Sequence, residues 1–128
     1  MRKIIYEDCN NNVGFLKELF IRIQELSDVE LSWCISNLDF IPIDRGDFFN
    51  GTLDVEMEKI LSFQKRFLDE HTIIMLHNEF IELLKNIKTI YEGDFGVIIN
   101  GKQSKIKVFD GDIIKIDGDI EDRISDCF

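Results

Sequence analysis

The chain has 128 residues, 45% of them hydrophobic and 31% charged, with 25 acids against 15 bases and a formal net charge of −10. This composition excludes a disordered chain, and the length is that of a single domain spanning residues 1–128. An acidic surface repels nucleic-acid phosphates and anionic membranes and favours cationic partners, although acidity also serves solubility alone.

No apolar run approaches the roughly 18 residues that a membrane span needs. Residues 1–8 also lack the apolar stretch of a signal peptide. The three cysteines, Cys9, Cys34 and Cys127, are odd in number and widely spaced, which is typical of free thiols in a reducing compartment. We therefore expect a cytoplasmic protein.

Residues 3–6 form a short β-strand candidate, and the polar residues 8–12 end it. A helix is predicted over residues 13–26, because apolar side chains recur there at spacings of three and four. These side chains are Phe15, Leu16, Leu19, Phe20, Ile23 and Leu26. Either Asn11 or Asn12 can cap this helix by accepting a hydrogen bond from a backbone N–H of the first turn.

Residues 30–35 alternate between apolar and polar side chains, with Leu31, Trp33 and Ile35 on one side, which predicts a half-buried strand. Residues 38–43 either extend this strand or pair with it, and Pro42 and the turn at residues 44–47 end the segment.

The apolar spacing predicts a second helix that starts at Thr52 or Asp54 and runs to about residue 68. Residues 72–76 are apolar and short, which favours a buried strand. A third helix is expected over residues 78–91, with Asn78 as its N-cap and Gly93 as the left-handed residue that ends it.

Three β-prone runs follow, over residues 94–99, 104–109 and 112–116, separated by Asn100-Gly101 and Asp110-Gly111. Such dipeptides between β-branched runs predict consecutive hairpins. A two-residue turn at Asn100-Gly101 places Phe95 opposite Ile106, so that apolar side chains share one face of the sheet.

The second hairpin has two possible registers. A two-residue turn at Asp110-Gly111 would place Ile106 opposite Lys115 and mix apolar and charged side chains on one face. A three-residue loop over residues 110–112 instead pairs Ile106 with Ile116, at the modest cost of setting Lys107 opposite Lys115. We favour the three-residue loop, although glycine usually stands last in such loops and Gly111 stands in the middle.

Together these elements predict an α+β fold, in which three amphipathic helices pack on a mainly antiparallel sheet that ends in a C-terminal β-meander.

No residue pattern indicates catalysis, a cofactor or a metal site. The C-terminal acids have the spacing of calcium ligands only in part, since Asp122 stands where a calcium loop needs glycine and Phe128 where it needs a carboxylate. His71 and His77 lack the spacing of a zinc site, and the glycines form no phosphate-binding loop.

Four features of the chain together resemble those of a known class of proteins. They are its size, its charge, its free cysteines and the lone Trp33 in Leu31-Ser32-Trp33-Cys34-Ile35-Ser36. The chain resembles the small acidic α+β immunity proteins that bacteria pair with polymorphic toxins. The resemblance implies a non-enzymatic module that occludes a basic protein partner, such as a toxin active site.

For this function we expect five acids to steer the partner, and two aromatic residues to anchor it. The acids are Asp110, Asp112, Asp117, Asp119 and Glu121, and the aromatic residues are Phe48 and Phe49. Phe48 and Phe49 have an alternative role, since their loop could pack back onto the core.

Two other classes of function stay open. One is a homodimeric structural or regulatory protein. The other is a small enzyme, for which a pocket should hold convergent polar groups and a titrating His71 or His77.

Overall fold

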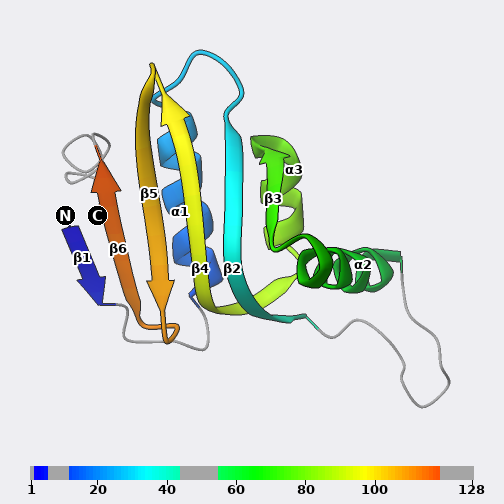
Figure 1. The fold of residues 1–128 in the computed structure, drawn as a ribbon. Helices are drawn as coiled ribbons and strands as arrows, with labels where there is room; N and C mark the ends of the chain where they lie inside the picture. Colours follow the sequence, from blue (N-terminus) through cyan, green and yellow to red (C-terminus); the bar gives the residue numbers. More distant parts are fainter. Residues whose placement is uncertain (1, 6–11, 44–54, 119–128) are drawn as a thin grey trace, which may run out of the picture.

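The computed structural model describes residues 2–5, 12–43 and 55–118. Its elements are β1 (Arg2–Ile5), α1 (Val13–Gln24), β2 (Ser32–Pro42), α2 (Val55–Glu70), β3 (Thr72–Leu76), α3 (His77–Leu84), β4 (Ile87–Ile99), β5 (Lys102–Phe109) and β6 (Ile113–Gly118). In this part of the chain the strands form one sheet in the order β1-β6-β5-β4-β2-β3, and every neighbouring pair is antiparallel (Figure 1). The predicted α+β class is confirmed.

The C-terminal meander has the predicted register. Phe95 lies opposite Ile106 across a two-residue turn, whose residues Asn100 and Gly101 have φ values of 52° and 80°. Positive φ at both central residues defines the turn type that matches the twist of two paired strands. The loop between β5 and β6 has three residues, because Phe109 pairs with Ile113. The preferred register is therefore confirmed.

That second loop also explains the unusual position of its glycine. Asp110 and Gly111 both have left-handed φ values, 54° and 75°. Asp is among the few non-glycine residues that adopt this conformation readily, so the glycine need not stand last.

Helices α1 and α3 cover one face of the sheet (Figure 1). An aromatic cluster joins them to it: the Phe20 ring lies 4.9 Å from Trp33, 5.0 Å from Phe80 and 5.1 Å from Phe95, measured between centroids. All four rings are fully buried or nearly so. Tilted aromatic pairs at these distances add stabilisation beyond the area they bury.

Helix α2 packs at the β2–β3 end of the sheet (Figure 1). Its Phe63 ring lies 6.2 Å from the ring of Phe40 on β2. Phe40 faces the core because β2 is irregular: its pairing with β4 shifts register between Ser36 and Asp39, where Asn37 has a φ of 53°. Residues 32–42 are thus one strand whose two halves are offset by a bulge.

Asn12 precedes α1 but does not cap it, which corrects one of the two predicted caps; Asn11 lies outside the described residues. No side-chain capping bond is made, and the Asn12 backbone is helical. Its amide nitrogen Nδ2 instead donates to the carbonyls of Ile90 (2.6 Å) and Gly111 (2.9 Å), and its Oδ1 accepts the Ile90 N–H (3.1 Å). This fully buried side chain therefore ties α1 to β4 and to the β5–β6 loop.

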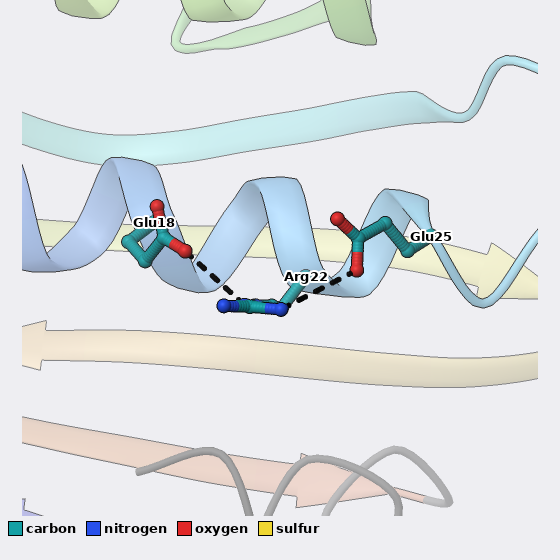
Figure 2. A network of polar contacts seen from close by, with 3 residues as sticks. All are labelled: Glu18, Arg22 and Glu25. Atoms are coloured by element: carbon teal, nitrogen blue, oxygen red, sulfur yellow. Dashed lines mark hydrogen bonds and ion pairs between the residues drawn. The ribbon is translucent and has the colours of Figure 1, made fainter.

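The solvent side of α1 carries a short ion-pair chain. Arg22 lies between Glu18, at 3.1 Å, and Glu25, at 3.7 Å (Figure 2). All three side chains are roughly half exposed, so each pair contributes only about 0.3–0.5 kcal/mol. We assign these charges to helix stability and solvation.

The predicted third helix is too long. Helix α3 ends at Leu84, and β4 begins at Ile87. The apolar residues 87, 90 and 91 have helical spacing, but this segment pairs with the second half of β2, with Ile90 opposite Phe40. Long-range pairing therefore overrides the local pattern.

Gly93 consequently lies inside β4 and does not end a helix. A Cβ atom at this position would lie 2.7 Å from the Phe95 ring. The glycine therefore makes room for a core aromatic residue.

Residues 72–76 form the predicted strand, but it is an edge strand and only half buried. Ile73 and Met75 face the core, whereas Ile74 is 70% exposed and Leu76 is 49% exposed. The interpretation as a buried strand was wrong, because an apolar run does not reveal whether both faces are covered. The start of the second helix, at Thr52 or Asp54, lies outside the described residues.

Candidate functional site

The face of the sheet opposite α1 and α3 carries a groove of about 510 Å³. Its floor consists of small residues on two central strands: Ser32 and Cys34 on β2, and Gly96 on β4. Cys34 lies directly opposite Gly96. A Cβ atom at Gly96 would contact Cys34 at ordinary van der Waals distances of 3.8–3.9 Å, so the missing side chain leaves a hollow and not a strained close approach.

Apolar side chains border this groove. Ile74 on β3 and Ile98 on β4 stand on either side of the floor and are 70% and 64% exposed. Val29, just before β2, is 69% exposed at one end. Exposed β-branched residues gathered around a hollow mark an interaction surface more often than scattered apolar residues do.

Two carboxylates mark the ends of the groove. Glu30 accepts the backbone N–H of Asn78 at 2.9 Å, and Asp94 accepts a hydrogen bond from the Asn37 side chain at 2.7 Å. These bonds hold both carboxylates in place before any partner arrives. Lys105 on β5 adds one cation to the lining.

The predicted steering acids do not form one cluster among the described residues. Asp110 and Asp112 lie in the loop before β6, whereas Asp117 lies near the far end of that strand. At about 3.3 Å per residue, Asp117 is about 16 Å from Asp112 along the strand. Asp117 pairs with Lys105 across the sheet. One oxygen of Asp112, Oδ1, is buried and has no hydrogen-bond partner among the described residues.

The remaining predicted site residues, Asp119, Glu121, Phe48 and Phe49, lie outside the described residues. Most of the acidic excess lies outside them too. Nine of the 25 acids and two of the 15 bases belong to residues 6–11, 44–54 and 119–128, which leaves 16 acids and 13 bases in the described part.

The two histidines differ in their surroundings. His77 is buried, and its Nδ1 accepts a hydrogen bond from Trp33 Nε1–H at 3.1 Å. Burial lowers the pKa of His77 below its ordinary value of 6.5, and the nearby Glu30 opposes that shift. His71 is exposed, with a φ of 63° at the junction of α2 and β3. Neither residue lines the sheet-face groove. His77 is thus a packed core histidine.

A second groove, of about 440 Å³, lies between α2 and α3. It is lined mostly by polar and charged side chains, including Arg66, which is paired with Glu70, and Glu82, which is paired with Lys85. The hydrogen bond and charge of Lys85 hold the pKa of Glu82 below its ordinary value. Exposed ion pairs of this kind contribute little free energy, so this groove offers a partner less binding free energy than the apolar groove does.

Among the described residues, no group of three or more His, Cys, Asp or Glu side chains could hold a metal ion. Within the same part of the chain, no helix is long and apolar enough to cross a membrane.

The sequence did not point to the groove, although one signal was present. The predicted register already placed Ile98 on the face opposite Phe95 and Val97, where an isoleucine is unexpected in a solvated strand. The rest of the groove requires β2, β3 and β4 to be neighbours, which no local pattern specifies.

Comparison of the chain with protein-family models, with curated proteins and with solved structures finds no match.

Proposed function

We propose that this protein is a non-enzymatic binding module that holds a protein partner against the uncovered face of its sheet. The observation that carries the proposal is the groove over Gly96, bordered by the exposed side chains of Ile74 and Ile98. An apolar centre with a polar rim is the usual composition of a protein interface.

The groove suits a partner that presents an apolar side chain flanked by basic ones. The apolar side chain would fill the hollow above Gly96. The basic side chains would meet Glu30 and Asp94, which are already held by hydrogen bonds to Asn78 and Asn37. Carboxylates fixed before binding lose little conformational entropy when the partner arrives.

We further propose that the partner is a basic protein and that a toxin active site is the occupant to test first. The net charge of −10 supports this, because an acidic protein attracts a basic one over distances of about a Debye length and so raises the association rate. In this proposal the five predicted steering acids act on the rate of encounter; they are Asp110, Asp112, Asp117, Asp119 and Glu121. Phe48 and Phe49 remain the proposed aromatic anchors, and the groove determines how long the complex lasts.

The proposal is tested by affinity capture from the lysate of the native host, at low and at high salt, with wild-type protein and three variants. Ile98→Lys places a cation in the apolar wall, and Gly96→Val fills the hollow. Leu68→Lys is the matched control, because Leu68 is 72% exposed on α2, away from the groove. The captured basic protein is then purified and its affinity for each variant is measured.

We expect Ile98→Lys to weaken binding by roughly 100-fold or more, because burying an unpaired charge costs several kcal/mol. Gly96→Val should weaken it as well, and Leu68→Lys should leave it unchanged. Equal affinity for wild type and Ile98→Lys, or an equal loss in Leu68→Lys, would show that the groove is not the binding surface.

The steering acids have a separate readout. Replacing all five with Asn or Gln should slow association and leave dissociation nearly unchanged, since long-range charge acts on encounter. An unaltered association rate at low salt would remove the five acids from the proposal without affecting the groove.

A further inference from the structure

Strand β3 forms one edge of the sheet, and its outer side is uncovered by any other described strand (Figure 1). The amide of His77 bonds to the carbonyl of Leu31 at 2.8 Å, and the same ladder sets Met75 opposite Trp33 and Ile73 opposite Ile35. Hydrogen bonds alternate along an antiparallel strand. The odd-numbered residues of β3 therefore bond to β2, and the even-numbered ones direct their N–H and C=O groups outward.

The outward residues are Thr72, Ile74 and Leu76. The Leu76 carbonyl is at the N-cap of α3 and accepts the first bond of that helix, so it is not free. The N–H groups of all three residues and the carbonyls of Thr72 and Ile74 have no backbone partner in the pairing with β2. Their side chains lie on the uncovered face, where Ile74 and Leu76 are exposed. The edge thus offers a partner both unpaired backbone groups and apolar side chains.

The two edges of the sheet are protected very differently. Many proteins carry a charged residue, a proline or a bulge in an edge strand, and these features prevent the strand from pairing with another chain. Strand β1, at the opposite edge, contains Arg2 and Lys3. Strand β3 reads Thr-Ile-Ile-Met-Leu and contains neither charge nor proline. The β3 edge therefore lacks the charged residues and the proline that discourage pairing with another strand.

We propose that the β3 edge pairs with the β3 edge of a second copy of this chain, in a two-fold symmetric dimer. The three outward residues are centred on Ile74, so the strand is complementary to its own antiparallel copy. Ile74 of one copy exchanges both backbone bonds with Ile74 of the second copy. Each Leu76 amide donates to the Thr72 carbonyl across the interface.

Charge and closure both favour a second copy as the occupant. The strand is uncharged, so two copies bring no like charges together where they touch. Pairing β3 with itself consumes both edges and closes the assembly, whereas pairing β3 with β1 of another copy would continue into an open chain of molecules. The two Ile74 side chains also become neighbours, so that the apolar borders of the two grooves join across the symmetry axis.

Two features predict that this dimer is weak. The paired edge is a strand of five residues, which is short for a stable interface. Each copy also carries a net charge of −10, so the copies repel at long range. Added salt should therefore tighten the dimer, which is the opposite of its effect on capture of a basic partner.

The test is sedimentation velocity in reducing buffer, from about 1 μM to about 1 mM, the range in which weak interfaces assemble. We expect the wild-type mass to rise with concentration from 15.0 kDa toward twice that value. Ile74→Pro removes an outward N–H without removing a bond to β2, and should weaken dimerisation roughly tenfold or more. Ile74→Ala keeps the N–H and should lose much less affinity.

Ile98→Lys is the second control, because Ile98 lies in the groove but on a central strand. It should dimerise like wild type even though it fails to capture the basic partner, which separates this inference from the proposed function. Ile74→Lys serves if Ile74→Pro does not fold, since it sets two cations side by side on the symmetry axis.

Three results would overturn the inference. The first is a wild-type protein that stays monomeric across the whole range. The second is an Ile74→Pro variant that folds and dimerises as wild type does. The third is an Ile98→Lys variant that dissociates as readily as Ile74→Pro, which would make the groove face the dimer interface in place of the edge.

Discussion

Asn12 is the residue whose replacement tests the fold most directly. Its side chain makes three hydrogen bonds, to the Ile90 N–H, the Ile90 carbonyl and the Gly111 carbonyl, and it is fully buried. Each buried bond contributes about 1 kcal/mol net, and a buried group left without a partner costs about 1–3 kcal/mol. Asn12→Ala removes all three bonds at once. We expect it to lower the free energy of unfolding by about 3 kcal/mol.

Other substitutions at the same position distinguish the tertiary role of Asn12 from helix capping. Asp and Ser are as good as Asn at an N-cap, so Asn12→Asp and Asn12→Ser would be nearly neutral if the side chain served as a cap. Because Nδ2 donates to two carbonyls, we expect Asn12→Asp to be at least as harmful as Asn12→Ala, since it sets a carboxylate against them.

The measurement is urea-induced unfolding at neutral pH, followed by Trp33 fluorescence and by circular dichroism. Asn78→Ala is the matched control. Asn78 was predicted as the N-cap of the third helix, but that position is held by Leu76, and Asn78 is an exposed residue inside α3. Its replacement should therefore change stability by no more than about 0.5 kcal/mol. A loss below about 1 kcal/mol for Asn12→Ala, or a neutral Asn12→Asp, would show that the Asn12 side chain does not hold α1 to β4 and the β5–β6 loop through these bonds.

Two further predictions concern stability. Gly14 is exposed on α1 with open space around its α-carbon, so Gly14→Ala should raise the free energy of unfolding by about 0.5–1 kcal/mol. Gly93→Ala should instead lower it by about 1–3 kcal/mol, because the new methyl group meets the Phe95 ring. Urea unfolding midpoints measure both effects, and a stabilising Gly93→Ala would be inconsistent with this packing. Burial lowers the pKa of His77 in the folded state, so the neutral form is the stable one, its contribution is complete above about pH 6.5, and it is lost as pH falls through the lowered pKa. Unfolding midpoints should therefore fall as pH is lowered from about 7.5 to about 5, and the fall should be shallower in His77→Asn. Identical slopes in wild type and His77→Asn would contradict the assignment.

The β-meander could be predicted with its register because its determinants are local. Asn100-Gly101 and Asp110-Gly111 adopt left-handed backbone conformations that few other residues tolerate, and the alternation of Ile106 and Val108 selects which face is buried. The third helix was predicted too long because helical spacing at residues 87–91 competes with pairing to β2, a strand about 50 positions earlier. The spacing of apolar residues within a segment carries no information about a pairing partner that distant in the sequence.

The candidate site likewise depends on contacts between segments that are distant in the sequence. A charge-based interpretation favoured the C-terminal acids, but the described acids among them stand at two ends of β6. The groove draws on Cys34, Ile74 and Gly96, which are far apart in the chain and become neighbours only when β3 and β4 both pair with β2. Its hollow exists because a glycine on β4 lies opposite a small residue on β2.

Local sequence was sufficient for the α+β class, for the two turns of the C-terminal meander and for the register of the last three strands, because hydrophobic period and turn chemistry act over a few residues. The strand order β1-β6-β5-β4-β2-β3, the identity of the edge strands and the choice of the uncovered face emerge only in the folded structure. These features depend on pairings between distant segments, whose free energies come from packing across the whole sheet.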